Sequence, residues 1–353
     1  MRIRESVDSH RFVDSLEIME TDKSNLRSVI LNSVEQLRAP MTFFNELHLT
    51  RKSFNKILVC GMGGSALTGD LLAYFQNSNF SPLSPKIPVT THRSYSLPGS
   101  ADENTLIVCV SYSGQTEETI SAFDKAVNSN FEVAGITCGG ELAELFQKYK
   151  TPWIKLPQDN VPPRTSLGYQ LSAITKILMA YGLLSRDAQN ILASLPEKII
   201  PSSFENQAKM LCSKLGHKIP IIYSSQENSA LARLWKIKLN ENAKIPAFFN
   251  SIPELNHNEM VGWTKNLGSF SLLFLRDKDD LPRIKKRMEL TASLLISQNL
   301  PIDFIDIAGE NPLEKIFWGS SFGDWLSYYL ALFYGIDPTP VALVEEFKKQ
   351  LKE

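Results

Sequence analysis

Two short loops in the first half of the sequence suit the binding of a phosphate group. The loop GMGGSA (61–66) follows the apolar run KILVC (56–60), and the loop SYSGQT (111–116) follows an apolar run that ends at Val110. Glycine lets the backbone approach a ligand closely, while hydroxyl groups and the N–H groups of a following helix donate hydrogen bonds to phosphate oxygens. Because the carboxyl ends of parallel strands share one edge of a sheet, we expect both loops to hold one phosphate group there.

Each loop also has a simpler explanation. GMGGSA fits the GxGxxA fingerprint of dinucleotide-binding domains, but the predicted second strand ends at His92-Arg93, where such a domain carries an acidic residue. The hydroxyl groups of 111–116 could instead cap the helix that follows them. The corresponding loops of the second half, 224–230 and 276–282, carry acidic residues and no glycine. The sequence therefore predicts one phosphate site per chain, in the first half.

Three further residues could take part in acid–base chemistry, and each has an ordinary structural alternative. Glu241 lies near the end of an apolar-faced helix, where it would be either a base or a solvated carboxylate. Arg164 follows Pro162-Pro163, which stiffen the backbone and suit an arginine directed into a cleft, although a surface arginine would fit as well. The imidazole of His257 could exchange protons with a substrate, but a histidine in a polar loop is usually just solvated.

These residues must be positioned by secondary structure, and the apolar pattern predicts strands that alternate with helices. The predicted strands are 56–60, 87–92, 105–111, 132–138 and 152–157 in the first half and 218–224, 269–277 and 301–309 in the second. The predicted helices are 66–75, 116–129, 141–149, 170–184, 227–244, 282–300, about 312–335 and about 340–352. Residues 1–50 are expected to form one or two leading helices, and 185–205 a connector.

This alternation is typical of parallel sheets covered by helices on both faces. The second half repeats the order of the first in a degenerate form. The sequence therefore predicts an α/β protein with two tandem doubly wound domains, each a mainly parallel sheet flanked by helices. The expected domains are 1–185, with the phosphate loops, and 186–353, with Glu241 and His257.

Composition excludes several classes of protein. The chain has 353 residues, and 37 Lys and Arg against 38 Asp and Glu give a net charge of −1, so it lacks the basic field of a general nucleic-acid binder. Apolar runs such as 270–275 are too short to cross a membrane, and the charged N-terminal segment is unlike a signal peptide. Cys60, Cys109, Cys138 and Cys212 lie far apart without metal-binding spacing, which predicts buried thiols in a reducing cytoplasm.

Five segments together resemble the bifunctional phosphoglucose/phosphomannose isomerases, a branch of the phosphoglucose isomerase superfamily built from two sugar-isomerase (SIS) domains. They are GMGGSALTGDLL (61–72), SYSGQTEETISAF (111–123), PPRTSLGY (162–169), NENAKIPA (240–247) and PELNHNEMVGW (253–263). The first two occur in SIS domains in general, whereas PPRTSLGY and ELNHNEMVGW are more specific to this branch. The collinear resemblance implies two tandem SIS domains.

The resemblance also implies an aldose–ketose isomerase that interconverts glucose 6-phosphate, and mannose 6-phosphate, with fructose 6-phosphate through an enediol, without a cofactor or metal. By similarity Glu241 is the base, Arg164 stabilises the enediolate, and His257 opens the sugar ring in the partner subunit of a homodimer. A C-terminal lysine assists ring opening; Lys348 is the best match after DPTPV, with Lys349 or Lys352 as alternatives. The residues expected to hold the substrate phosphate are Gly63, Gly64, Ser65, Ser111, Ser113 and Thr116.

The sequence leaves other functions open. A SIS-domain regulator that binds a sugar phosphate without turnover would keep both loops but need neither Glu241 nor His257. An isomerase restricted to glucose 6-phosphate would share every motif, because no residue in the sequence identifies the space around C2. A nicotinamide-dependent reductase using GMGGSA is disfavoured by the missing ribose-binding carboxylate. The C-terminal lysines could all lie on a solvated helix face.

Overall fold

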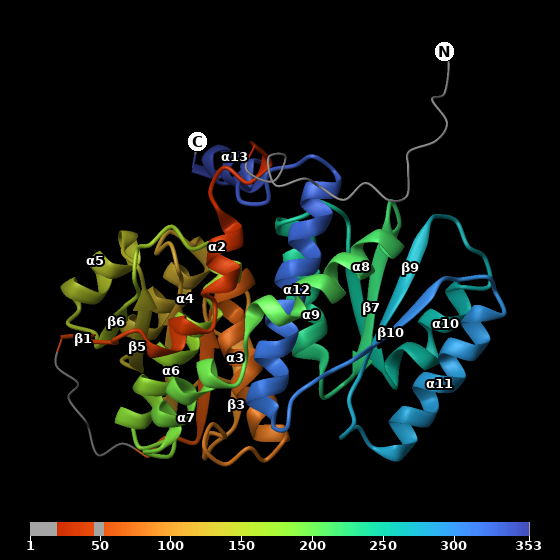
Figure 1. The fold of residues 1–353 in the computed structure, drawn as a ribbon. Coiled ribbons are helices and arrows are strands. Elements are labelled where there is room, and N and C mark those ends of the chain that lie inside the picture. The colour runs from red at the N-terminus through yellow and green to blue at the C-terminus, as the bar shows by residue number, and fades with distance from the viewer. Residues whose placement is uncertain (1–19, 46–52, 353) are drawn as a thin grey trace.

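The computed structural model of the chain describes residues 20–45 and 53–352, and its first half is built on a six-stranded sheet (Figure 1). The strands are β1 (Phe43–Phe44), β2 (Lys56–Cys60), β3 (Val89–His92), β4 (Thr105–Val110), β5 (Glu132–Thr137) and β6 (Trp153–Lys155). Their order is β1-β6-β5-β4-β2-β3, and all neighbours are parallel except β1, which is antiparallel to β6. The five strands predicted for this half are confirmed.

Helices cover both faces of this sheet. They are α2 (Leu26–Leu31), η1 (Glu35–Arg38), α3 (Gly63–Asn77), α4 (Glu117–Asn128), α5 (Gly140–Lys148), η2 (Pro163–Thr165), α6 (Leu167–Ala180), α7 (Ala188–Ser194) and η3 (Leu195–Glu197), where η marks a 3₁₀ helix; η4 (Pro201–Phe204) packs on α8 and α12 instead. Ile57 and Val59 of β2 belong to the core that includes α3 and α6, whereas Leu58 and Cys60 pack in a second core with Phe123 of α4. A strand buried on both faces is apolar throughout, which explains the continuous run KILVC.

Within the described residues the second sheet has four strands, all parallel. They are β7 (Ile219–Ser225), β8 (Phe248–Ile252), β9 (Phe270–Arg276) and β10 (Ile302–Asp306). Their order, β10-β9-β7-β8, repeats the order β5-β4-β2-β3 of the first sheet. The helices of this half are α8 (Glu205–Leu215), α9 (Ser229–Glu241), η5 (Glu254–His257), α10 (Glu259–Gly262), α11 (Pro282–Ile296), α12 (Pro312–Phe333) and α13 (Ala342–Lys352). The predicted α/β fold with two tandem, mainly parallel sheets is confirmed.

The segments outside these sheets differ in part from the expectation. Among residues 20–45, Glu20 and Thr21 are helical and α2 and η1 follow, as expected for leading helices, but Phe43–Phe44 form β1, which pairs with β6; residues 1–19 and 46–50 lie outside the described part. The expected connector 185–205 contains α7 and two 3₁₀ turns. Pro196 and Pro201 do not prevent these elements, because each proline lies in the first turn of a 3₁₀ helix, where its missing N–H is not needed.

The sequence interpretation also lacks α8 and β8. α8 buries Ala208, Leu211 and Leu215, a helical spacing that was available in the sequence. β8 lies at the edge of its sheet, and its first residue, Phe248, is exposed. β8 also contains Asn250 and Ser251, so the continuous apolar run that identifies buried strands is missing from it.

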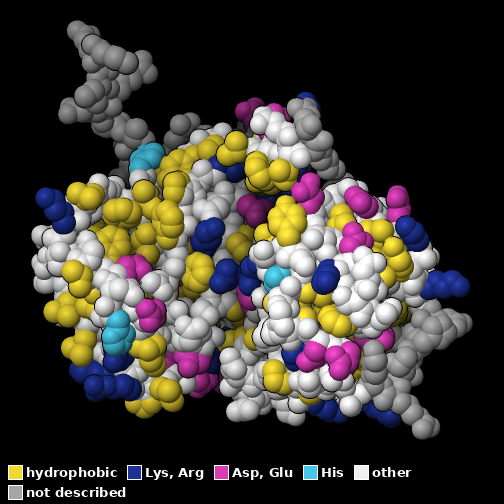
Figure 2. Space-filling view, turned by 180° about the vertical axis from the view of Figure 1, so that it is seen from behind, with side chains coloured by type: hydrophobic (Ala, Val, Ile, Leu, Met, Phe, Trp, Pro, Cys, Tyr) yellow, Lys and Arg dark blue, Asp and Glu magenta, His cyan; other side chains and the backbone are white. Residues whose placement is uncertain are grey.

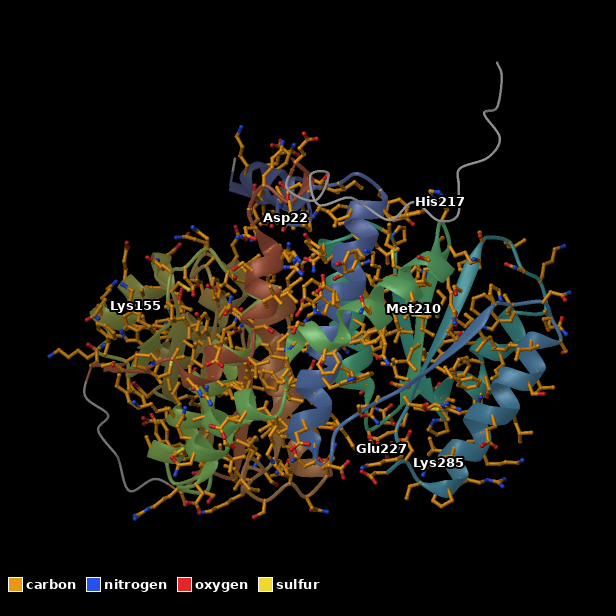
Figure 3. The ribbon with its side chains drawn as sticks, viewed as in Figure 1. Asp22, Lys155, Met210, His217, Glu227 and Lys285 are labelled. Carbon is orange, nitrogen blue, oxygen red and sulfur yellow. The ribbon has the colours of Figure 1, made fainter. Side chains whose placement is uncertain are left out.

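The two sheets point in opposite directions along the molecule. Figure 3 shows His217, just before β7, and Glu227, just after it, at opposite ends of the molecule. Lys285 lies near Glu227, and Asp22 lies at the same end of the molecule as His217. The carboxyl edge of the second sheet therefore lies at the Glu227 end, and α9 and α12 run back from it toward α13 (Figure 1). α12 is buried on all sides between the halves, which explains its largely apolar sequence, and its buried charged residues Lys315 and Asp324 are paired.

Candidate active site

A cavity of about 390 Å³ lies where the first sheet meets the C-terminal ends of α9 and the chain. Its lining includes eight of the ten predicted site residues: Gly63, Gly64, Ser65, Ser113, Thr116, Arg164, Glu241 and Lys348. Segments more than 280 residues apart in the sequence thus share one cavity. The two predicted residues outside the lining are Ser111 and His257.

The two phosphate-type loops lie side by side because β2 and β4 are neighbours in register, with Cys60 opposite Cys109. α3 begins at Gly63, within the segment 61–66 expected to be a loop, and α4 begins directly after the second loop, so the unpaired N–H groups of their first turns are at the cavity. The Ser65 hydroxyl accepts a hydrogen bond of 3.1 Å from the backbone N–H of Tyr112, which joins the loops. This edge offers backbone and hydroxyl donors together with the positive ends of two helix dipoles.

The hydroxyl groups of the second loop do not cap α4. Thr116 occupies the N-cap position of α4 but makes no capping hydrogen bond, and its Oγ1 lies 2.8 Å from Oγ of Ser111. Ser111 is buried, and its Oγ also accepts a 3.0 Å hydrogen bond from the N–H of Gly114. Ser111 therefore fixes the loop through hydrogen bonds behind the cavity wall, while Ser113 and Thr116 line the cavity.

Gly64 brings the first loop against the backbone that carries Arg164. A Cβ atom at Gly64 would lie 2.8 Å from the carbonyl oxygen of Pro163 and 3.1 Å from the nitrogen of Arg164. Side chains cannot be accommodated at such distances without a backbone shift. The glycine thus allows η2 to pack directly on the first turn of α3 and fixes where Arg164 starts.

Arg164 is buried, which excludes a solvated surface role. Its Nη2 donates to the carbonyls of Pro338 and Thr339, both at 2.9 Å, and its Nε donates to Oδ1 of Asn242. Nη1 lies 3.3 Å from the Glu241 carboxylate. Burial lowers the pKa of Arg164, and Glu241 opposes that change. A guanidinium remains charged in proteins, so a fixed cation lies at the cavity wall.

Glu241 is the last residue of α9, and its side chain is 33% exposed, so the carboxylate lies between the cavity and the Arg164 guanidinium. The chain turns directly after it, at Asn242 and Lys244. Asn242 is fully buried, and its Nδ2 donates to Ser327 of α12 at 2.9 Å. Sequence reasoning missed Asn242 and Lys244 as functional residues, although both belong to the NENAK segment that carries the family resemblance.

Of the three C-terminal lysines, Lys348 lines the cavity and Lys349 does not. The side chain of Lys352 lies outside the described part of the chain. α13 carries Lys348 over the loops together with Val344, Phe347 and Leu351, which also line the cavity. The spacing of these apolar residues follows one helix face, a signal that identifies the covering face of α13.

His257 is exposed and lies at the other end of the second domain. It follows β8, which is parallel to β7, so it belongs to the carboxyl edge of the second sheet and not to the cavity. It forms no hydrogen bond or ion pair with any described residue. The neighbouring Glu259 instead accepts hydrogen bonds of 2.5 Å from Tyr223 and Asn250, and Glu254 accepts one from Asn258.

Comparison with known proteins identifies the family. Residues 204–351 match the model of the bacterial phospho-glucose isomerase C-terminal SIS domain. The bifunctional phosphoglucose/phosphomannose isomerase of Caldicellulosiruptor bescii is 35% identical over 92% of this chain and 98% of its own length. The enzyme of the same name from Aquifex aeolicus is 31% identical, covering 85% and 91%. The chain belongs to the bifunctional phosphoglucose/phosphomannose isomerase family.

This membership confirms the family resemblance that the five sequence segments predict. The fold is shared more widely: the C-terminal domain of glucosamine-fructose-6-phosphate aminotransferase from Francisella tularensis superposes with a TM-score of 0.62 at 15% identity, covering 92% of this chain and 97% of that domain. Among the described residues, no helix is both long and apolar enough to span a membrane.

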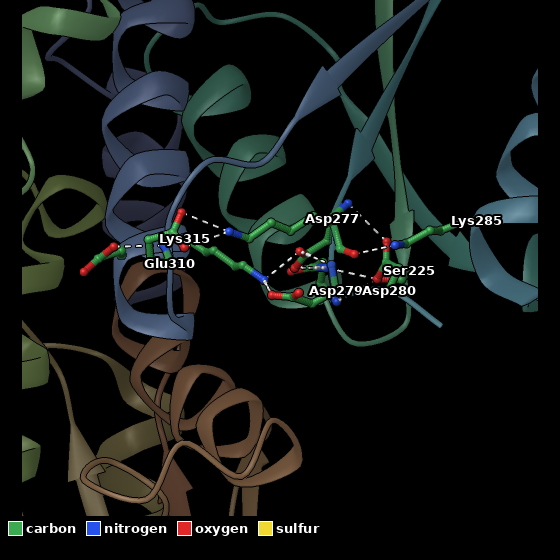
Figure 4. Close-up of polar contacts among 10 residues, drawn as sticks. Ser225, Asp277, Asp279, Asp280, Lys285, Glu310 and Lys315 are labelled. Atoms are coloured by element: carbon green, nitrogen blue, oxygen red, sulfur yellow. Dashed lines mark hydrogen bonds and ion pairs between the residues drawn. The ribbon is translucent and has the colours of Figure 1, made fainter. Parts of the chain in front are cut away.

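The loops at the carboxyl edge of the second sheet carry charged residues, unlike the phosphate-type loops of the first sheet. Asp277 and Asp280 are buried there, and Lys315 lies 2.6 Å from Asp277 and 2.5 Å from Asp279 (Figure 4). Burial, with the nearby Asp277, raises the pKa of Asp280. A cavity of about 520 Å³ at this edge is lined by five carboxylates and three cations. The excess of carboxylates agrees with the expectation that these loops do not suit a phosphate.

Proposed function

We propose that this family member interconverts glucose 6-phosphate and mannose 6-phosphate with fructose 6-phosphate, using Glu241 as the base. The observation that carries the proposal is the single cavity that joins the two phosphate-type loops, the Arg164–Glu241 pair and Lys348. A regulator that only binds would not need a carboxylate held 3.3 Å from a buried guanidinium at the cavity wall.

In this mechanism the loops hold the phosphate and so orient the sugar. Glu241 removes a proton from one of the carbons C1 and C2 and returns it to the other, through an enediolate. Nη1 of Arg164 stabilises the negative charge on the enediolate oxygens, because its other donors are already engaged. If C2 can be reprotonated on either face after rotation about C2–C3, one site serves both the glucose and the mannose epimers.

Ring opening requires acid–base groups at the ring oxygen, and Lys348 and His257 are proposed for it. Lys348 lies in the cavity of its own chain, whereas His257 lies at the far edge of the second domain. We therefore propose a homodimer in which each His257 reaches the cavity of its partner. An exposed histidine on a loop fixed by Glu259 is suited to this role. Figure 2 shows hydrophobic side chains gathered on the half of the rear face that carries the second sheet, and these would favour association.

One assay tests the reaction. Purified protein in EDTA, without added nucleotide, is expected to convert fructose 6-phosphate to both glucose 6-phosphate and mannose 6-phosphate, each followed by a coupled enzyme. Formation of glucose 6-phosphate alone would restrict the activity to phosphoglucose isomerase. Binding of fructose 6-phosphate without turnover would favour the regulator, and turnover only with a nicotinamide cofactor would favour the reductase.

A further inference from the structure

Two cations from different elements meet at one backbone carbonyl beside the cavity. Nη2 of Arg164 and Nζ of Lys244 each donate to the carbonyl of Pro338 at 2.9 Å. Lys244 also donates to the carbonyl of Glu241 at 2.6 Å and to that of Asn242 at 3.3 Å. Its ammonium therefore ties the C-terminal end of α9 to the segment 336–341 that leads into α13.

Among the described residues, α13 has few polar contacts of its own. Every residue from Ala342 to Leu351 is exposed, although Val344, Phe347 and Leu351 line the cavity. The side chains of α13 make no hydrogen bond or ion pair with the rest of the described chain; within the helix, Gln350 donates a hydrogen bond to Glu346. The position of α13 thus depends on the segment before it, where the contacts are those of Arg164 and Lys244.

The backbone at Lys244 suggests that its side chain has a specific use. Its φ is +58°, in the left-handed region, and six of the nine non-glycine residues with positive φ in the described chain are asparagines. A side chain with Cβ costs free energy in this conformation, and at Lys244 the hydrogen bonds of the ammonium offset that cost. At Lys244 the turn directs the ammonium back over the carbonyls at the end of α9.

We propose that Lys244 is a positioning residue: its ammonium, bound to the carbonyls of Glu241 and Pro338, holds α13 and therefore Lys348 over the cavity. The charged groups that face it are Arg164 from η2, Glu241 from α9 and Asp337 from the connecting segment. The inference rests on the proposed function, in which Lys348 assists ring opening. Loss of the ammonium charge weakens its bonds to the carbonyls and loosens α13.

The titration of Lys244 gives the proposal a measurable signature. Burial, and after it the Arg164 charge, lower its pKa from 10.5 to about 8. Activity should therefore fall as pH rises through about 8. Global stability should change in the opposite sense: the folded state binds fewer protons than the unfolded state between pH 8 and 10.5, so this group makes the free energy of unfolding rise with pH there. If Lys244 only stabilised the fold, activity would not fall over the pH range in which the free energy of unfolding rises.

The test compares three variants of the full-length chain. Lys244→Met should lower kcat by about tenfold or more at pH 7, the loss expected for charge-assisted hydrogen bonds, and change KM little because the loops hold the phosphate. Lys244→Arg should recover most of kcat and move the alkaline decline to higher pH. Lys150→Met is the control, since Lys150 is an exposed lysine with a φ of +53° outside the cavity lining.

Amide hydrogen exchange separates this proposal from the proposed function. At pH 7, residues 342–351 should exchange at least several-fold faster in Lys244→Met than in the natural protein or in Lys150→Met, with the cores of both sheets unchanged. Unchanged exchange in α13 would overturn the proposal whatever the activity. If the natural protein has no isomerase activity but α13 loosens, the positioning role stands and the proposed function fails. Equal loosening of α13 and both cores, without rescue by arginine, would mean a structural role only.

Discussion

At the scale of residues, the site depends on how the donors of Arg164 are divided. Asn242 and two carbonyls take Nε and Nη2, which leaves Nη1 beside Glu241. A guanidinium fixed in this way does not have to reorganise when negative charge develops nearby, and such preorganised donors are among the most effective means of stabilising a transition state. The carboxylate and the cation thus lie on the same wall of the cavity, as the proposed reaction requires.

Glu241→Gln should lower kcat by about 100- to 10,000-fold, because an amide cannot accept the proton. The side chain keeps its size, so binding of fructose 6-phosphate by the loops should change little. Steady-state kinetics and isothermal titration calorimetry measure the two effects. A variant that retains full turnover would show that another group is the base.

Lys348→Ala should reduce kcat, and Lys349→Ala should leave it near that of the natural protein. Both lysines lie on α13, but Lys348 lines the cavity and Lys349 does not. Assays started from the cyclic sugar phosphate should show the difference, because a lysine that assists ring opening acts only on the closed form. Equal effects of both substitutions would favour the solvated lysine face.

At the scale of elements, the contact between the first turn of α3 and η2 sets the position of Arg164. Gly114 makes a similar contact in the second loop: its φ is +68°, and a Cβ atom there would lie 1.8 Å from the carbonyl oxygen of Gly139. Both loops are therefore held by backbone packed on backbone. Such contacts leave little freedom to the first turns of α3 and α4, which face the cavity.

Gly64→Ala should lower kcat/KM and destabilise the fold by about 1–3 kcal/mol through overpacking. The added Cβ would displace η2 and with it Arg164, since the Pro163 carbonyl is only 2.8 Å away. Thermal unfolding and steady-state kinetics check the two parts. Gly99→Ala serves as the control, because nothing lies within 4 Å of a Cβ at that glycine. A Gly64→Ala variant with normal stability and kinetics would contradict this packing argument.

At the scale of the whole molecule, the opposite directions of the two sheets explain why the C-terminal end of α9 lies at the cavity of the first domain. α9 carries Glu241 away from the carboxyl edge of its own sheet and toward that of the first. Beneath the cavity α9 is joined to α12 by the fully buried pair Lys238–Asp324 at 2.6 Å, and by Asn242 with Ser327. These buried polar contacts specify how the two helices align.

Mixed dimers test whether His257 acts in the partner subunit. Glu241→Gln and His257→Ala should each be strongly impaired alone. After unfolding and refolding together, random pairing should restore about one quarter of the natural activity, because half of the dimers then contain one complete site. The absence of any recovery, with mixed dimers demonstrated by differently sized tags, would place His257 in its own subunit or outside the reaction.

The alternating strands and helices, the tandem architecture, the phosphate-type loops and the family could all be predicted from the sequence. All of these depend on local apolar periodicity or on short motifs, which a chain displays residue by residue. The sequence did not reveal β8, α8 or β1. β8 and β1 are edge strands, and β8 contains Asn250 and Ser251, so it lacks the continuous apolar run of a buried strand.

Only the tertiary structure decided which side chains meet. It placed Lys348 and not Lys349 in the cavity, assigned Ser111 to the support of Thr116, and showed that His257 lies away from Glu241 in the same chain. It also brought Lys244 to the carbonyl of Pro338, 94 residues away in the sequence. Such contacts depend on the relative direction of two sheets and on the packing of α9 and α12, and no local pattern in the sequence encodes either.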